Sequence, residues 1–309
     1  MELDIVAIGE PMIEFNQTAE RGGRLYLQGY GGDTSNLAIA AARQGARTGY
    51  VTALGDDIYG RMFLDLWRKE GVDASQVKID SSAPTGIYFV THAEGRHHFT
   101  FARAGSAASR FAPGDMLADY VAGARVVHMS GISLAISASA CDACYAAAHA
   151  AKAAGRLVSF DTNLRLKLWS QDRARAAILD MMRLADICLP SFDDVAELTG
   201  LRDPDALVDL ALNLGARTVA LKLGADGALV ATGTERHRIR PFRVDAVDAT
   251  GAGDTYGGAF LSRLVAGDDI RAAGRYAAVA AALSTTGYGA VEPIPRAERV
   301  KEELKTWAE

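Results

Sequence analysis

The sequence has few cysteines, no long apolar run and no leader-like amino terminus. Its three cysteines, Cys141, Cys144 and Cys188, form an odd set without a second Cys or His cluster, so a redox or tetrahedral metal site lacks its partners. No window approaches the roughly 18 apolar residues of a membrane-spanning helix. The first residues lack the basic start and apolar core of a signal peptide. We therefore expect a cytoplasmic protein with no membrane partner.

An excess of basic charge is also missing. The chain has 33 Lys and Arg residues against 38 Asp and Glu residues, a formal net charge of -5, and its basic residues are scattered. Without a basic patch, a nucleic-acid partner is not expected. Hydrophobic residues make up 49% and charged residues 23%, which is ordinary globular usage. At 309 residues the chain favours one large domain with an attached subdomain.

Two common nucleotide-binding fingerprints are absent as well. The sequence has no strand-linked Gly-x-Gly-x-x-Gly with a downstream acid, and it has no Gly-Lys dipeptide. Neither a Rossmann fingerprint nor a Walker loop is therefore present. This argues against a nucleotide-binding dehydrogenase, which stays open here as a rival class together with a non-catalytic nucleotide-binding module.

What the sequence does have is an alternation of short apolar runs with longer helical stretches. The runs that we expect to be strands are residues 3–8, 49–54, 125–129, 157–160, 187–189 and 218–221. The stretches that we expect to be helices include residues 36–44, 138–154, 173–184 and 204–214, and after Gly258 the chain looks helical nearly to its end. This alternation predicts an α/β fold, a doubly wound three-layer α/β/α sandwich with ligands beyond the carboxyl ends of the strands.

Two stretches interrupt the alternation, residues 13–31 and 85–103. The second predicts a β-hairpin around a turn at Glu94-Gly95. Strands without crossover helices do not belong in a parallel sheet, so we expect a small antiparallel lid.

The expected domains follow from this division. The lid subdomain comprises residues 13–32 and 84–106, and the main domain, which binds nucleotide and substrate, comprises residues 1–12, 33–83 and 107–309. A lid sheet with a half-apolar face would leave a patch that self-association could bury. We therefore expect a homo-oligomer, either a dimer through the lid or a higher assembly.

The segment at residues 248–260 carries the strongest chemical signal. The small residues Gly251-Ala252-Gly253 open a helix, where unpaired backbone N–H groups and the helix dipole favour an anion. Asp254 follows and places a carboxylate where a hydroxyl group could meet a phosphoryl group. An Asp that merely caps the helix is the alternative. Gly257-Gly258 costs about 1 kcal/mol per residue in a helix, which indicates that something passes closely over it.

A second glycine pair lies far upstream, in Gly31-Gly32-Asp33-Thr34-Ser35-Asn36, and also leads into a helix. The two segments resemble the amino- and carboxy-terminal signatures of the ribokinase-like (PfkB) carbohydrate kinases, and the resemblance covers essentially the whole chain. It implies the ribokinase-like fold, ATP as phosphoryl donor, Mg2+, and a monovalent cation such as K+ as a further candidate. It also implies that Asp254 is the catalytic base, with the Gly251-Ala252-Gly253 amides beside it.

Within that family the sequence most resembles kinases of 2-keto-3-deoxygluconate, in residues 9–14, 32–34, 103–107 and 161–169. The resemblance implies transfer to the 6-hydroxyl, which gives 2-keto-3-deoxy-6-phosphogluconate in sugar-acid catabolism of the Entner-Doudoroff type. A sugar acid carries a carboxylate that a neutral sugar lacks, so its pocket should hold a guanidinium. Arg103 and Arg165 are the candidates. A neutral sugar such as fructose or ribose remains the alternative acceptor.

The resemblance also implies the remaining site residues. Those expected to bind the sugar are Gly31, Gly32, Asp33, Asn36, Tyr88, Phe101, Arg103, Arg165 and Asp254. Those expected to bind ATP are Lys222, Gly224, Gly227, Gly251, Gly253 and Ser191. Asp194 resembles a residue linked to magnesium in the family, and we expect it to act on the metal through water.

Overall fold

The computed structural model describes residues 2–93 and 96–307, so the turn predicted at Glu94-Gly95 lies outside the described residues. The strands are β1 (Ile5–Ile8), β2 (Met12–Gln17), β3 (Tyr26–Gly31), β4 (Thr48–Val51), β5 (Ala53–Gly55), β6 (Val72–Asp73), β7 (Lys78–Asp80), β8 (Gly86–Ala93), β9 (Arg96–Ala102), β10 (Val126–Ser130), β11 (Leu157–Asp161), β12 (Ile187–Cys188), β13 (Thr218–Lys222), β14 (Ala228–Thr232) and β15 (Arg236–Ile239).

The α-helices lie between and after these strands. They are α1 (Asp33–Arg43), α2 (Ile58–Glu70), α3 (Ala118–Ala122), α4 (Gly131–Ala135), α5 (Ala138–Ala153), α6 (Gln171–Leu184), α7 (Phe192–Thr199), α8 (Pro204–Leu214), α9 (Ala252–Ala266), α10 (Ile270–Ser284) and α11 (Ala297–Thr306). The described part of the chain contains no helix with the length and apolarity that a membrane crossing requires.

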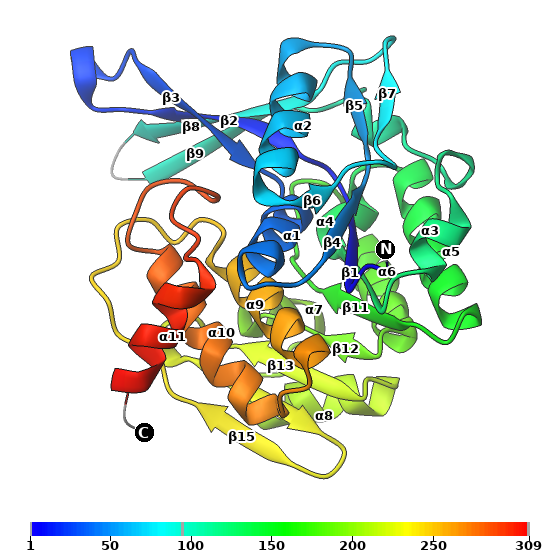
Figure 1. Cartoon of the computed structure of the whole chain (residues 1–309), viewed down its shortest axis with the longest axis vertical. Helices are drawn as coiled ribbons and strands as arrows, with labels where there is room; N and C mark the ends of the chain where they lie inside the picture. Colours follow the sequence, from blue (N-terminus) through cyan, green and yellow to red (C-terminus); the bar gives the residue numbers. More distant parts are fainter. Residues whose placement is uncertain (1, 94–95, 308–309) are drawn as a thin grey trace.

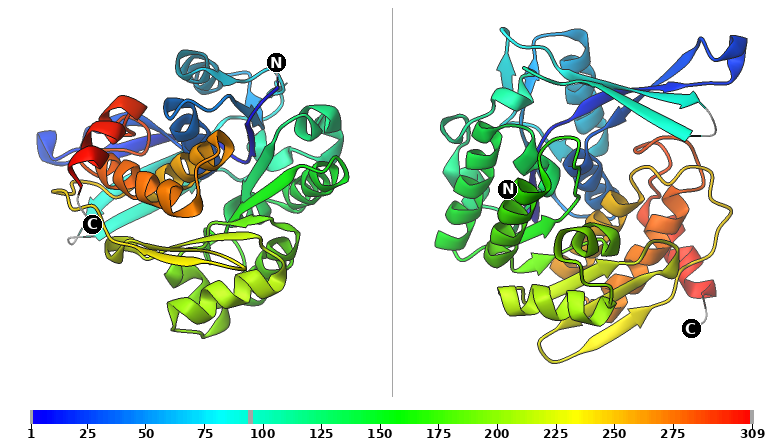
Figure 2. Two further views of the ribbon diagram at one scale, coloured as in Figure 1. Left: turned by 60° about the horizontal axis from the view of Figure 1, so that its bottom comes forward. Right: turned by 180° about the vertical axis from the view of Figure 1, so that it is seen from behind.

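The central sheet confirms the predicted fold class. Among the described residues its strand order is β15-β14-β13-β12-β11-β10-β1-β4-β6. The pairings from β6 through β13 are parallel, so the carboxyl ends of these strands share one edge. Strands β14 and β15 extend the sheet in antiparallel fashion and were not among the predicted strands. The left panel of Figure 2 shows orange and yellow-green helices on opposite sides of the yellow strands.

Alternate residues of the parallel strands face two different hydrophobic cores. In β1, Val6 and Ile8 pack into the core shared with α5, α6 and α8, whereas Ile5 packs into the core shared with α9 and α10. Both faces of the central sheet are therefore apolar, and for this reason its parallel strands are continuous apolar runs in the sequence. Helix α1 packs directly against α9, and this contact brings the two glycine-rich segments of the sequence together (Figure 1).

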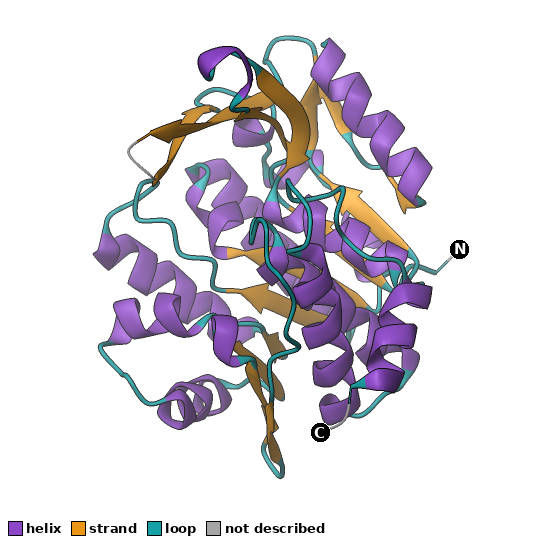
Figure 3. Cartoon of the chain, turned by 90° about the vertical axis from the view of Figure 1, so that its left-hand side faces the viewer, coloured by secondary structure: helices purple, strands orange, loops and turns teal. Residues whose placement is uncertain are grey.

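A separate four-stranded sheet has the order β3-β2-β8-β9 among the described residues and lies at one end of the molecule (Figures 1 and 3). The lid was predicted to be antiparallel, and one of its pairings corrects this. Strand β2 runs parallel to β8, with Met12 opposite Gly86, whereas β2–β3 and β8–β9 are antiparallel. The chain leaves the main domain along β2 and returns along β3, and later leaves again along β8 and returns along β9. The two outgoing strands, β2 and β8, therefore point in the same direction.

Candidate active site

Helix α9 begins at the site that the sequence predicted to bind an anion. Its N-cap residue Gly251 has φ 75°, and a Cβ there would lie 3.0 Å from Ala290, so only glycine fits the turn. No side chain caps this helix in the described structure. The first-turn amides of Gly253 and Asp254 therefore have no partner within the helix, and the positive end of the helix dipole lies at the same point.

Asp254 is the third residue of α9 and is half-buried. One of its carboxylate oxygens accepts a hydrogen bond of 2.9 Å from Nδ2 of Asn36, on α1. Loss of solvent raises the pKa of Asp254 to about 7, helped by the nearby carboxylates of Asp33 and Asp161 and opposed by the Asn36 hydrogen bond and by Lys222. The side chain does not cap its own helix. It is instead a carboxylate whose proton equilibrium lies near neutral pH, as a general base requires.

The glycine pair before α1 is required by close packing. A Cβ on Gly31 would lie 2.4 Å from the hydroxyl of Tyr88, and a Cβ on Gly32 would lie 2.4 Å from the carbonyl oxygen of Glu10. Gly32 also has φ 108°, a conformation that favours glycine. These glycines therefore let the start of α1 lie against both β1 and the lid.

The start of α1 presents unused acceptors. Asn163 donates a hydrogen bond of 2.7 Å to one oxygen of Asp33, but the other oxygen of Asp33 is buried without a hydrogen-bond partner among the described residues. The same holds for Oδ1 of Asn36. Buried polar atoms are usually paired, so these two oxygens are acceptors that a hydrogen-bond donor at the start of α1 could use.

On the lid side, two buried glutamates hold the predicted sugar-binding residues. The hydroxyl of Tyr88 donates to Glu14, and burial raises the pKa of Glu14. Arg103 forms an ion pair with Glu10, whose other oxygen accepts a hydrogen bond of 2.9 Å from Ser106. Arg103 is thus already paired with a carboxylate of the protein.

Two other predicted sugar-binding residues are more open to solvent. Phe101 is exposed and stacks beside Tyr88, with ring centroids 5.7 Å apart. Arg165 follows β11 and is also exposed, and its guanidinium donates a 2.7 Å hydrogen bond to the neighbouring carbonyl of Leu164. This hydrogen bond lies within the loop of Arg165 itself, so the part of Arg165 in the site stays a prediction.

Apart from the glycines at the start of α9, the predicted nucleotide residues lie beyond β12, at the end of β13 and in the loop after β13. Lys222 forms an ion pair with Asp161, and it is 3.6 Å from the position of a Cβ on Gly253. Gly224 and Gly227 have φ 59° and 89°, so both adopt conformations that favour glycine in the loop after β13. Ser191 precedes α7 and donates its backbone N–H to Thr162.

Asp194 does not face a metal cluster. One of its oxygens accepts hydrogen bonds from the hydroxyl of Thr162 and from the amide of Leu164, so it fixes the loop after β11. Among the described residues, no group of three or more His, Cys, Asp and Glu side chains could hold a metal ion. Mg2+ that is held mainly by phosphates and water needs only one or two carboxylates from a protein, so its binding does not require such a group.

The sequence analysis left Glu10 and Asp161 without a role, although both lie in segments that carry the family resemblance. A signal was available for each, because Glu10 lies two residues beyond β1 and Asp161 ends β11, at the strand ends where ligands of α/β folds bind. Their partners, Arg103 and Lys222, are about 93 and 61 residues away in the chain, and no local pattern pairs them.

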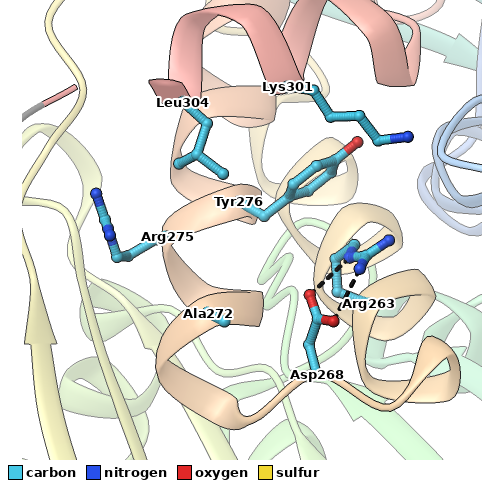
Figure 4. A pocket seen from close by; sticks show the side chains of 7 residues that line it. All are labelled: Arg263, Asp268, Ala272, Arg275, Tyr276, Lys301 and Leu304. Carbon is cyan, nitrogen blue, oxygen red and sulfur yellow. Dashed lines mark hydrogen bonds and ion pairs between the residues drawn. The ribbon is translucent and has the colours of Figure 1, made fainter. Parts of the chain in front are cut away.

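Two surface cavities of the described structure lie away from this site. One of about 230 Å³ lies between α9, α10 and α11, and Figure 4 shows Arg263 held by both oxygens of Asp268 on its wall. Another of about 320 Å³ lies at the amino ends of β10, β11 and β13. Asp254 lines neither cavity. In the first cavity, Asp268 already neutralises the charge of Arg263.

Known proteins resemble this chain over nearly its whole length. The model of the pfkB family carbohydrate kinases matches residues 2–297. A 2-dehydro-3-deoxygluconokinase from Thermoproteus tenax is 37% identical, over 98% of this chain and 94% of its own, and a probable fructokinase-4 from Arabidopsis thaliana is 34% identical, over 97% and 96%. The solved structure of an E. coli protein named putative ribokinase II, in complex with ATP and Mg2+, has a TM-score of 0.91 at 25% identity, covering 99% of this chain and 100% of its own.

Proposed function

The chain belongs to the pfkB family of carbohydrate kinases, and we propose that it transfers the γ-phosphoryl group of ATP to the 6-hydroxyl of 2-keto-3-deoxygluconate. The observation that carries the reaction is Asp254 beside the uncapped start of α9, with a pKa near neutral. The keto acid is supported by the similarity to the Thermoproteus tenax 2-dehydro-3-deoxygluconokinase, since 2-dehydro and 2-keto name the same group.

Asp254 has the position and the proton equilibrium of a general base. Its carboxylate accepts the hydroxyl proton while the sugar oxygen bonds to the γ-phosphorus and the bond from that phosphorus to the bridging oxygen of ADP breaks. Asn36 holds one oxygen of Asp254 through its amide, which leaves the other for the incoming hydroxyl. The proton ends on Asp254 and the phosphoryl group on the sugar.

The start of α9 stabilises the charge that develops on the transferred group. The amides of Gly253 and Asp254 lack helical partners, and Lys222 lies over the same turn. Preorganised donors of this kind are typically worth a factor of about 100 to 1,000 in turnover each. Bound Mg2+ would add neutralisation between the phosphates, and Asp194 is the candidate to hold its water ligands.

The sugar pocket lies between α1 and the lid. The buried oxygens of Asp33 and Asn36 suit sugar hydroxyls as donors, and Tyr88 and Phe101 offer an aromatic wall. Arg103 and Arg165 are the residues to bind the sugar-acid carboxylate. The exposed apolar side chains of the lid, Leu25, Tyr26, Leu27, Phe99 and Phe101, support self-association through this sheet.

One observation favours a second candidate, a kinase of a neutral ketose such as fructose. Glu10 already neutralises Arg103, which reduces the charge that this arginine can offer to a substrate carboxylate. The similarity to the Arabidopsis thaliana fructokinase is nearly as extensive as that to the keto-acid kinase. Discrimination between the two acceptors would then depend mainly on Arg165.

The acceptor is tested by measuring ADP release from ATP with gluconate-derived keto acids, fructose, ribose and nucleosides. We expect the highest kcat/KM for 2-keto-3-deoxygluconate, with phosphate on its 6-hydroxyl in the isolated product. A higher kcat/KM for fructose would establish the second candidate instead. Absence of ADP release with every acceptor would contradict both.

The variant Arg165→Ala tests whether Arg165 binds the carboxylate of the sugar acid. We expect kcat/KM for the keto acid to fall about tenfold or more, because a charge-assisted contact is lost, while activity on any neutral sugar changes little. Lys167→Ala is the matched control, since Lys167 is an exposed cation of the same loop. Equal losses on charged and neutral sugars would assign Arg165 to folding rather than recognition.

A further inference from the structure

Lys222 and Asp161 meet across a strand that ends early. Cys188, the last residue of β12, is level with Phe160 of β11 on one side and with Val219 of β13 on the other. Strand β13 continues to Lys222, which is level with Ser191 in the segment that follows β12. The lysine side chain crosses over this segment and reaches Asp161 at the end of β11.

The resulting ion pair is strongly shielded from water. The side chains of Lys222 and Asp161 are only 13% and 5% exposed. Burial raises the pKa of Asp161, and the ammonium of Lys222 opposes that rise. A buried ion pair usually adds little stability over well-packed apolar residues, because both ions lose their water. Stability alone therefore does not account for this pair.

The position of the ammonium group places it at the predicted phosphoryl site. Its Nζ lies 3.6 Å from where a Cβ on Gly253 would stand, over the first turn of α9. It is close enough to Asp254 to lower the pKa of that carboxyl. The cation thus lies beside both the amides that would hold a phosphoryl group and the base that would activate the acceptor.

Asp161 is itself fixed by the backbone. Its second oxygen accepts the amide of Asn163 at 3.2 Å. The same loop is held by Asp194, through Thr162 and Leu164. Because two carboxylates anchor this loop, Asp161 cannot follow the lysine when Lys222 acquires a new partner.

We propose that Asp161 is a positioning residue, which holds the Lys222 ammonium over the start of α9 until the γ-phosphoryl group of ATP replaces Asp161 as its partner. The proposal rests on ATP as the donor proposed above. Lys222 then contacts the oxygens of the phosphoryl group during transfer, and Asp161 acts on that group through Lys222. Without Asp161, the flexible lysine still binds phosphate but samples many rotamers, so turnover suffers more than ATP affinity.

A double-mutant cycle tests this proposal with Asp161→Asn, Lys222→Met and the double variant. We expect Lys222→Met to lower kcat about 100-fold, the scale for one lost donor to the transition state. Asp161→Asn should lower kcat about tenfold while the ATP dissociation constant stays the same or decreases, because an anion near the phosphates is removed. The double variant should lose no more than Lys222→Met alone, and since it removes both buried charges it should fold even where one single variant does not.

The matched control is the ion pair between Lys152 and Asp186, at 2.8 Å, whose carboxylate is also 5% exposed. It lies at the opposite end of the sheet, before β12. Asp186→Asn should leave kcat within about twofold of the wild type. A kcat of the double variant that is reduced by the product of the two single reductions would overturn the proposal. A kcat of Asp161→Asn within about twofold of the wild type would overturn it as well.

Titration with nucleotides distinguishes failure of this proposal from failure of the proposed kinase function. Calorimetric titration with ATP and with ADP requires no sugar, and Lys222→Met should weaken ATP about tenfold while sparing ADP, because only ATP has the γ-phosphoryl group. Equal effects on both nucleotides would overturn the proposal whichever acceptor the enzyme uses. Absence of ATP binding by the wild type would instead contradict the kinase function itself.

Discussion

Asp254→Asn is expected to lower kcat about 100-fold or more while ATP affinity changes only a few-fold, the usual consequence of removing a general base. Asparagine keeps the shape of the side chain and can still accept the Asn36 hydrogen bond of 2.9 Å. It cannot accept the hydroxyl proton as a carboxylate does. ADP release at saturating ATP and sugar measures the first effect, and calorimetric titration with ATP measures the second.

Asp193→Asn is the control for this experiment, since Asp193 is an exposed carboxylate near the same edge of the sheet. It should retain wild-type turnover. If Asp254→Asn also kept turnover within a few-fold of the wild type, Asp254 would be a structural residue and the base would lie elsewhere. A parallel loss of ATP binding would indicate that the start of α9 had been distorted.

Gly258→Ala is expected to destabilise the protein and to impair catalysis together. An added Cβ would lie 2.5 Å from the carbonyl oxygen of Leu37 and 2.7 Å from Cβ of Ala40, so α1 and α9 must separate. Overpacking of this kind typically costs about 1 to 3 kcal/mol. The free energy of unfolding in urea should fall by that amount, even though alanine itself favours a helix by about 1 kcal/mol.

Catalysis should suffer because the two helices carry the two halves of the site. Helix α1 supplies Asn36 and α9 supplies Asp254, and small misplacements of reacting groups can cost about 100-fold. Gly257→Ala is the matched control, since its Cβ would meet mainly the flexible end of Leu37 at 2.9 Å. We expect it to stay within about 1 kcal/mol of the wild type. Equal stability of both variants would contradict close packing at Gly258.

These two glycines show what the sequence could and could not predict. Their presence in a helix predicted that something passes closely over it, and the structure shows that α1 does so at Gly258. Most strands of the parallel sheet were predictable because each apolar run is a local feature of the sequence. The two-residue strand β6 was not predicted, and the expected strand at residues 49–54 is divided into β4 and β5, of which β5 pairs with β7 in a separate sheet. The Glu10–Arg103 and Asp161–Lys222 pairs were not, because they depend on which strands neighbour each other in space.

The antiparallel extension and the lid register illustrate the same limit. Strands β14 and β15 join the main sheet by a hairpin, whereas the prediction relied on crossover helices to recognise strands of that sheet. The parallel pairing of β2 with β8 joins segments that are separated by α1 and α2. The local apolar–polar pattern of a strand does not indicate in which direction such a distant partner runs.

The most direct test of the central claim, that Asp254 is the base of a sugar kinase, is the pH dependence of kcat/KM for the sugar at saturating ATP. The environment of Asp254 raises its pKa to about 7, so the active carboxylate form is lost as the pH falls below that value. We expect kcat/KM to fall about tenfold per pH unit on the acid side of a midpoint near 7 and to level off above it. A profile that stays flat from about pH 5.5 to 8.5 would contradict the claim.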